Sequence, residues 1–180
     1  DAFLRLLGYY VSEGCATMFN GHKAVEFSIG DHEPQLRDDI LELIREVTGK
    51  RASVTHDRRK HGLCIVVYSD ALWDSMVEHG GKYAAGKRFS KAVMDLPPAR
   101  QQLAVDTYYL GDGSVSRHGK LRIVRACTVS QTLAFQLQEM LARRGVFAYL
   151  NRREAFDETM KDGRVVRHST RYWVYYAENT

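Results

Sequence analysis

The sequence has few cysteines, few prolines and no long apolar run. Its three cysteines, Cys15, Cys64 and Cys127, form no CxxC pair, so we expect neither a disulfide framework nor a zinc site. No apolar segment approaches the roughly 20 residues that a membrane helix needs. The first ten residues have no basic leader and no initiator Met, which indicates an internal piece of a longer protein. We therefore expect an intracellular, reducing setting and no membrane partner.

Positive charge is unevenly distributed along the chain. The net charge is +4 over 180 residues, which by itself is weak evidence for a nucleic-acid partner. The strand-like segments 15–30, 52–68, 114–125 and 151–172 together carry 14 Lys and Arg against 6 Asp and Glu. The segment 31–50, in contrast, holds six acidic residues and three basic ones. This distribution favours a sheet that binds a polyanion, although exposed strands also carry Lys and Arg to prevent edge pairing.

The same series of predicted elements occurs twice. Helical spacing over 2–12 is followed by a hairpin around Asn20–Gly21, a helix over 31–50 with Asp31 as a plausible N-cap, and a second hairpin. A short helix then closes the first half at Gly80–Gly81. The second half repeats the helix, the hairpin and a helix capped by Ser130, and then two strands enclose a long basic loop over 152–171.

This repeat predicts an α+β fold with antiparallel sheets, built as two pseudo-symmetric α-β-β-α-β-β halves. We expect the first half, with its linker, at 1–97 and the second at 98–180. The second half has no counterpart of the short closing helix before the sequence ends. Two such halves in one chain imitate a twofold dimer, so we expect a monomer.

The two opening helices carry similar motifs. LLGYYVSEG at 6–14 and VDTYYLGDG at 105–113 share a tyrosine pair and an acidic residue followed by glycine, and Glu13 and Asp112 lie 99 residues apart. Small residues recur four apart, and such spacing lets two helix backbones approach closely. We therefore predict a parallel helix interface formed by Gly8, Ser12, Thr107 and Gly111.

That packing would bring Glu13 and Asp112 together at one end of the helix pair. A helix C-terminus is already partly negative, and a second carboxylate adds repulsion that raises at least one pKa. A hard divalent cation with oxygen ligands relieves this repulsion, which makes Mg²⁺ the expected cofactor. Open coordination positions on such an ion suit the attack of water on a phosphodiester.

The two motifs resemble those of the LAGLIDADG homing endonuclease family, and FLRLLGYYVSEG looks most like the versions found in inteins. The resemblance covers both halves. It implies a monomeric endonuclease that makes a staggered double-strand break in DNA, with the motif helices at the interface between halves. It also implies a saddle of two sheets over the major groove and Mg²⁺ at Glu13 and Asp112, with Gly14 and Gly113 beside them.

The resemblance implies two further features. A basic residue in the segment between the halves commonly lies near the site, and Lys87 matches that position, although it also suits a solvated linker. Its counterpart in the second half would lie beyond Thr180. Asp1 is no splicing nucleophile, so any splicing domain of a parent intein is expected to flank this chain.

DNA contacts are expected from basic residues on the sheet face and at the hairpin tips. Arginine pairs bidentately with guanine, and both Lys and Arg neutralise phosphate. The candidates are Arg58, Arg59, Lys60, Arg117, Lys120, Arg122, Arg152, Arg153, Arg164, Arg167 and Arg171. Which face of a strand each occupies depends on register, which the sequence leaves open.

Two other functions share this fold prediction. A DNA-binding module of the same fold that does not cut, such as a regulator or an eroded endonuclease, would usually lack the motif acids, and both acids are present here. An RNA-splicing cofactor is a more distant alternative. Nicking of a plasmid with Mg²⁺, with and without Glu13→Gln, separates these functions.

Overall fold

The fold is described from a computed structural model, in which residues 1–57, 62–119 and 121–179 are described. The helices are α1 (Ala2–Glu13), α2 (Pro34–Thr48), α3 (Asp70–Gly80), α4 (Lys91–Met94), α5 (Pro98–Asp112) and α6 (Gln131–Ala142), with a short 3-10 helix η1 (Ala84–Gly86). The strands of the first half are β1 (Gly14–Phe19), β2 (His22–Gly30), β3 (Ser53–Asp57) and β4 (Gly62–Tyr68). Those of the second half are β5 (Gly113–His118), β6 (Leu121–Thr128), β7 (Tyr149–Arg153), β8 (Phe156–Thr159), β9 (Val165–His168) and β10 (Arg171–Asn179).

Each half contains one antiparallel four-stranded sheet, and the two sheets have the same topology. The strand order is β1-β2-β4-β3 in the first half and β5-β6-β10-β7 in the second. In both halves the first two strands form a hairpin, and the last strand in sequence lies between this hairpin and the third strand. The prediction of an α+β fold in two α-β-β-α-β-β halves is confirmed.

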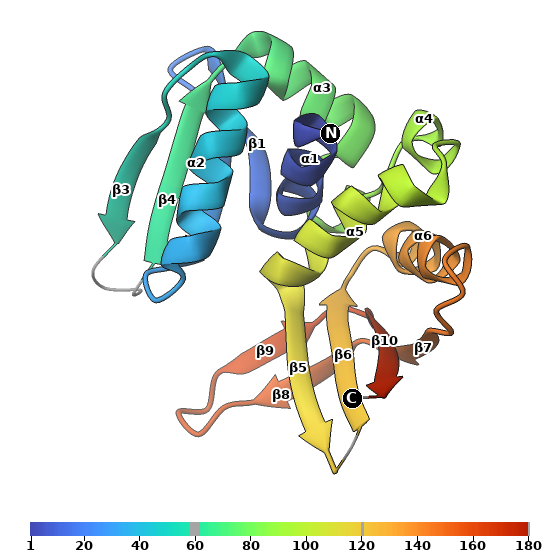
Figure 1. Ribbon diagram of the computed structural model, residues 1–180. Coiled ribbons are helices and arrows are strands. Elements are labelled where there is room, and N and C mark those ends of the chain that lie inside the picture. The colour runs from blue at the N-terminus through green and yellow to red at the C-terminus, as the bar shows by residue number, and fades with distance from the viewer. Residues whose placement is uncertain (58–61, 120, 180) are drawn as a thin grey trace.

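The core lies between the sheets and the helices. Alternate residues of β2, namely Val25, Phe27 and Ile29, are buried, as period-two strands with one covered face require. Leu36, Ile40, Leu43 and Ile44 form the buried stripe of α2. Helices α1 and α5 cross at the centre, between the two halves (Figure 1), and this pair makes the closest association between helices in the molecule.

Two local predictions were wrong. Helix α2 begins at Pro34, after Glu33, whereas Asp31 was expected as the cap. Proline favours the first helical position because its fixed φ suits a helix and its missing N–H has no partner there anyway. The segment 152–171 is not a long loop, because β8 and β9 pair within it as a separate two-stranded sheet. The Ser130 cap is as expected, since its Oγ accepts from Leu133 N at 3.2 Å.

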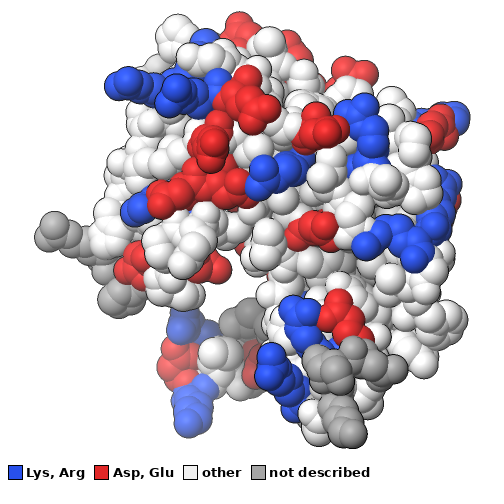
Figure 2. All heavy atoms as spheres, viewed as in Figure 1, with Lys and Arg blue, Asp and Glu red and all other residues white. Residues whose placement is uncertain are grey.

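Figure 2 shows acidic side chains gathered over α2 on one face of the molecule, while Lys and Arg are spread over both halves of that face. No helix in the described part of the chain is long and apolar enough to span a membrane.

Candidate functional site

The helix pair α1 and α5 places equivalent residues of the two halves against each other. A Cβ added to Gly8 would lie 2.0 Å from Thr107 Oγ1, and one added to Gly111 would lie 2.3 Å from Ser12 Oγ. Residues 8 and 107 are 99 apart in the chain, as are 12 and 111. Residues that meet their own counterparts lie on the pseudo-twofold axis. The structure therefore brings together all four residues of the predicted interface.

The contact at Gly8 involves the backbone. The same added Cβ would lie 2.2 Å from the Ala104 carbonyl oxygen, and Thr107 Oγ1 donates to the Arg5 carbonyl at 2.8 Å across the interface. Because the backbones are this close and run in parallel, the ends of the two helices emerge side by side.

Glu13 and Asp112 occupy these two helix ends. A Cβ on Gly111 would come within 3.0 Å of Glu13 Cγ. Desolvation, followed by the charges of Asp112 and Glu33, raises the pKa of Glu13 to about 7. Desolvation also raises the pKa of Asp112 to about 6, although this side chain is partly exposed. Tyr108 and the charge of Lys87 lower the same pKa. The site thus carries two carboxylates whose negative charge is not neutralised by the positive charge nearby.

Lys87 lies at the same helix ends and is 6% exposed. Its Nζ donates to the carbonyl oxygens of Tyr10 at 2.6 Å and Gly14 at 2.9 Å, and it lies 3.4 Å from the centre of the Tyr10 ring. Desolvation lowers the pKa of Lys87 to about 7, against the charges of Cys15 and Asp112, which raise it. Lys87 is therefore a buried amine beside the carboxylates and not a solvated linker residue.

The segment around Lys87 is fixed by the second half. Ser130 Oγ donates to the Lys87 carbonyl at 2.6 Å, and the Gln136 amide bonds both backbone groups of Phe89, at 2.8 and 2.7 Å. The backbone of Lys87 is thus hydrogen-bonded to the N-terminal end of α6, while its amine reaches the end of α1. Sequence analysis did not identify Ser130 and Gln136 as supports of this segment.

An open cleft of about 490 Å³ lies at these helix ends. Its lining includes Lys87, Asp112, Cys15 and Cys127. Gly14, which was expected near the metal, also lines the cleft, but its carbonyl oxygen already accepts a hydrogen bond from Lys87. Gly113, the other glycine expected there, is the first residue of β5 and pairs with Ala126.

The donor set at the cleft suits a divalent ion with few protein ligands. Among the described residues, no group of three or more His, Cys, Asp or Glu side chains gathers at one point. The two carboxylates and the nearby backbone carbonyls are hard oxygen donors, which Mg²⁺ accepts while it keeps several waters. Desolvation is the main reason that both carboxylate pKa values are raised, and a bound cation would stabilise the ionised forms.

The open faces of the two sheets, turned away from the helices, differ in character. On the first sheet the open face carries Cys15, Thr17, Glu26, Ser28, Ser53, Thr55, Cys64 and Val66. On the second sheet it carries Ser114, Ser116, Arg125, Tyr149, Asn151, Arg153, Arg171, Trp173 and Tyr175. In the described part of the chain, the basic residues of the open faces therefore belong to the second half.

The predicted DNA-binding residues divide by position. Arg153 and Arg171 pair with each other on the open face, and both guanidinium groups lie over the Phe156 ring, at 4.2 and 5.8 Å. Arg164 and Arg167 lie in the β8–β9 hairpin. Arg117, Arg122 and Arg152 lie on the helix side of the sheet, and Arg122 bonds Glu178 at 2.5 Å. Arg58, Arg59, Lys60 and Lys120 lie outside the described residues.

Arg125 is absent from the sequence-based set although it lies at the middle of the second open face. Its Nε donates to Ser114 Oγ at 3.1 Å, and its guanidinium lies 5.8 Å from the Trp173 ring. With Asn151 and Tyr175 it lines a depression of about 310 Å³. The apolar neighbours Val124 and Ala126 were the signal, because alternation along a strand turns the residue between them outward.

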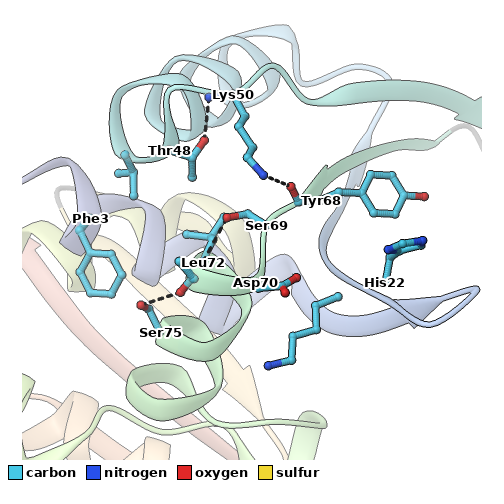
Figure 3. Close-up of a pocket in the computed structure, with 12 residues that line it drawn as sticks. Phe3, His22, Thr48, Lys50, Tyr68, Ser69, Asp70, Leu72 and Ser75 are labelled. Atoms are coloured by element: carbon cyan, nitrogen blue, oxygen red, sulfur yellow. Dashed lines mark hydrogen bonds between the residues drawn. The ribbon is translucent and has the colours of Figure 1, made fainter.

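Another cleft lies away from this site. It measures about 710 Å³ and is lined by Phe3, His22, Tyr68 and the start of α3 (Figure 3). Lys50 Nζ points to its edge and donates to the Tyr68 carbonyl at 2.8 Å. Phe3 is ten residues from Glu13, about 15 Å along α1, so this cleft is not part of the carboxylate site.

Known structures and proteins resemble this arrangement. The crystal structure of I-DmoI in complex with DNA and Ca superposes with a TM-score of 0.66 over 97% of this chain and 82% of that chain, at 12% identity. Full-length DUF199/WhiA from Thermatoga maritima matches with a TM-score of 0.62 over 97% of this chain and 50% of that chain, at 15% identity. Residues 102–179 match the model of the LAGLIDADG-like domain.

The chain has a LAGLIDADG-like fold in two halves.

Curated relatives match this chain over a part of their own, longer sequences. An iron-sulfur cluster assembly SufBD family protein of Mycobacterium tuberculosis is 32% identical over 176 residues, which are 98% of this chain and 21% of that protein. A DNA polymerase of Thermococcus kodakarensis is 28% identical over 151 residues, which are 82% of this chain and 8% of that protein. This chain thus spans about a fifth or less of the length of these relatives.

Proposed function

We propose that this protein is a site-specific homing endonuclease that makes a staggered double-strand break in DNA by Mg²⁺-dependent phosphodiester hydrolysis. The observation that carries the proposal is the meeting of Glu13 and Asp112 on the pseudo-twofold axis, with a buried Lys87 beside them. Two carboxylates related by a twofold axis suit two scissile phosphates related by the twofold axis of duplex DNA.

In this mechanism Glu13 and Asp112 would hold the metal ions. When bound, Mg²⁺ supplies a polarised phosphate oxygen and a more acidic water. Lys87 has a pKa near 7, so at neutral pH its Nζ can take up or give back a proton near the reacting groups. The contacts from Nζ to the Tyr10 and Gly14 carbonyls keep the amine at the end of α1. Duplex DNA would lie across the two open sheet faces.

A plasmid library with a randomised insert tests this function. Incubation with Mg²⁺ should linearise a subset of plasmids that share one site. Glu13→Gln or Asp112→Asn should abolish double-strand cleavage of that site while affinity stays within about tenfold, or roughly 1.4 kcal/mol. Full cleavage by either variant would contradict the metal-site assignment.

We further propose that the chain is the endonuclease part of an intein, next to a flanking splicing domain. One segment of this length matches proteins whose names have nothing in common, an iron-sulfur assembly protein and a DNA polymerase, and each time covers a small share of the longer protein. A mobile insertion would give this pattern. Expression of the whole open reading frame should yield a spliced product by mass spectrometry, and a single unspliced chain would contradict the intein proposal.

A DNA-binding module that does not cut is the alternative. Its support is the match to DUF199/WhiA over 97% of this chain. Selective binding of a duplex without any cleavage in Mg²⁺ or Mn²⁺ would favour that function.

A further inference from the structure

Glu26 and Arg125 occupy the same place in the two halves. Glu26 pairs with Cys15, the second residue of β1, and Arg125 pairs with Ser114, the second residue of β5. Both lie on the second strand of their sheet, on the open face, and they are 99 residues apart. The pseudo-twofold axis therefore relates an acidic position to a basic one.

The two side chains have different neighbours on their open faces. Arg125 donates through Nε to Ser114 Oγ at 3.1 Å, and its guanidinium lies 5.8 Å from the centre of the Trp173 ring. An arginine fixed in this way loses little conformational freedom on binding. The Glu26 carboxylate lies near the Cys64 thiol on the adjacent strand. Burial and then this carboxylate raise the pKa of the thiol to about 12, so the thiol stays protonated.

The Arg125 guanidinium requires hydrogen-bond acceptors on a base edge, whereas the Glu26 carboxylate requires a donor. A guanidinium donates bidentately to O6 and N7 of guanine, whereas a carboxylate accepts from N4 of cytosine. In a palindromic site, equivalent positions on the two halves would face the same base. Here a donor and an acceptor face the two related positions, so one base cannot satisfy both.

We propose that Glu26 and Arg125 form a specificity pair that makes the target non-palindromic, with guanine facing Arg125 and cytosine at the twofold-related position facing Glu26. The proposal rests on the proposed DNA-binding function and adds the identity of two target bases. The pair sets which half-site each half of the protein occupies, and thus the orientation of the protein on its site.

Selection from a randomised duplex library tests the pair without requiring cleavage. The parent should enrich sites with guanine in one half-site and cytosine at the related position of the other. Arg125→Ala should reduce the guanine preference by roughly tenfold or more and leave the other half-site unchanged. Arg125→Lys keeps the charge but removes bidentate geometry, so it should lose most of the same preference while it folds and binds.

Each substitution of Glu26 should change the preferred base to the one that the new side chain recognises. Glu26→Gln should change the preference from cytosine to adenine, because an amide bonds N6 and N7 of adenine. Glu26→Arg should make the selected site guanine at both related positions. The double exchange Glu26→Arg with Arg125→Glu should exchange the two bases between the half-sites. Arg117→Ala, on the helix side of the same sheet, is the matched control and should leave every preference unchanged.

Each outcome bears on the pair. An enriched site whose bases do not respond to changes at 26 and 125 would overturn the pair and leave site-specific DNA binding intact. A response at the guanine position alone would overturn the role of Glu26. Failure of the parent to enrich any duplex would overturn the proposed function and the pair together.

Discussion

The two halves share a backbone plan and differ in the side chains that they turn away from the helices. Toward the core, Val25 and Val124 are equivalent, as are Ile65 and Val174, and all four are buried. Toward the open face, Thr55 corresponds to Asn151, and Ser53 corresponds to Tyr149. The core side preserves apolar character because register depends on it. The open side has no such constraint, so the halves could diverge there for recognition.

The axis between the halves shows the same contrast at the end that carries the two carboxylates. Asp112 has the charge of Lys87 beside it, whereas the charged neighbours of Glu13 are Asp112 and Glu33. The two carboxylates are therefore equivalent in position and unequal in environment.

Lys87→Met gives the largest expected difference between the two half-sites. We expect cleavage of one strand to slow by about 10²-fold, a usual contribution of a general acid or base, and the other strand to be affected less. The measurement is the accumulation of nicked circles in a plasmid time course. Lys91→Met, at an exposed lysine of α4, is the control. Equal slowing of both strands would contradict the asymmetry.

Gly8→Ala should break the equivalence at the axis. The added methyl group would overlap Thr107 Oγ1 and the Ala104 carbonyl, so the helices must separate, at a cost of about 1–3 kcal/mol. Gly111→Ala should behave similarly because it meets Ser12. Urea denaturation measures both. Gly86→Ala makes the same change where nothing lies within 4 Å, and it should shift stability by less than about 0.5 kcal/mol.

Arg153→Ala with Arg171→Ala should weaken DNA binding through the second half. If each arginine neutralises one phosphate, the log–log salt slope should flatten by roughly 1.8 and affinity should fall by about tenfold. Fluorescence anisotropy over a salt series checks this. The comparison is Arg117→Ala with Arg122→Ala, which removes the same charge from the opposite face of the same sheet. Equal slopes for the two double variants would contradict the facing that we describe.

The smallest expected effect is a pH dependence of the metal-free protein. Because the folded pKa of Glu13 is raised to about 7, ionisation costs more in the folded state than in the unfolded one. This penalty appears as pH rises from about 4.5 to 7. Lys87 adds little pH dependence to the stability in this window, because below about pH 7 its amine is protonated in both the folded and the unfolded state.

Urea titrations of the parent and Glu13→Gln isolate this penalty. The parent should lose about 1 kcal/mol relative to Glu13→Gln between pH 5 and 8, after allowance for partial solvent exposure. Mg²⁺ at pH 8 should restore the loss in the parent and leave the variant unchanged. A constant difference between the two proteins across this range would contradict the raised pKa.

The sequence predicted the parts of this molecule that depend on local pattern. The repeated element series, the small residues of the axis and the meeting of Glu13 with Asp112 all follow from spacing along helices. The sequence analysis missed Arg125, although alternation between Val124 and Ala126 could have placed it on the open face. Register was needed to see that Arg153 and Arg117 lie on opposite faces. Lys87 could be placed only by resemblance, because its burial depends on Ser130 and Gln136, more than 40 residues away in the chain.

The β8–β9 hairpin escaped prediction because its strands are only four residues long. They show weak apolar alternation and are rich in charged residues, which are depleted in strands. Their pairing is accompanied by the stacking of Phe156 on His168 within the hairpin at 4.5 Å, and by the contact of Arg153, from β7 of the sheet, with the Phe156 ring.

The contacts on the axis also record how a fused chain differs from a dimer of identical chains. In such a dimer, each residue on the axis faces its own copy and must be complementary to itself. Here Gly8 faces Thr107 and Ser12 faces Gly111, so each larger side chain fills the space left by a glycine. Two copies of the first half would bring glycine to glycine and serine to serine, and the fit would be lost. Divergence of the two copies has thus made each half dependent on the other, and a return to separate, self-pairing subunits would require paired substitutions.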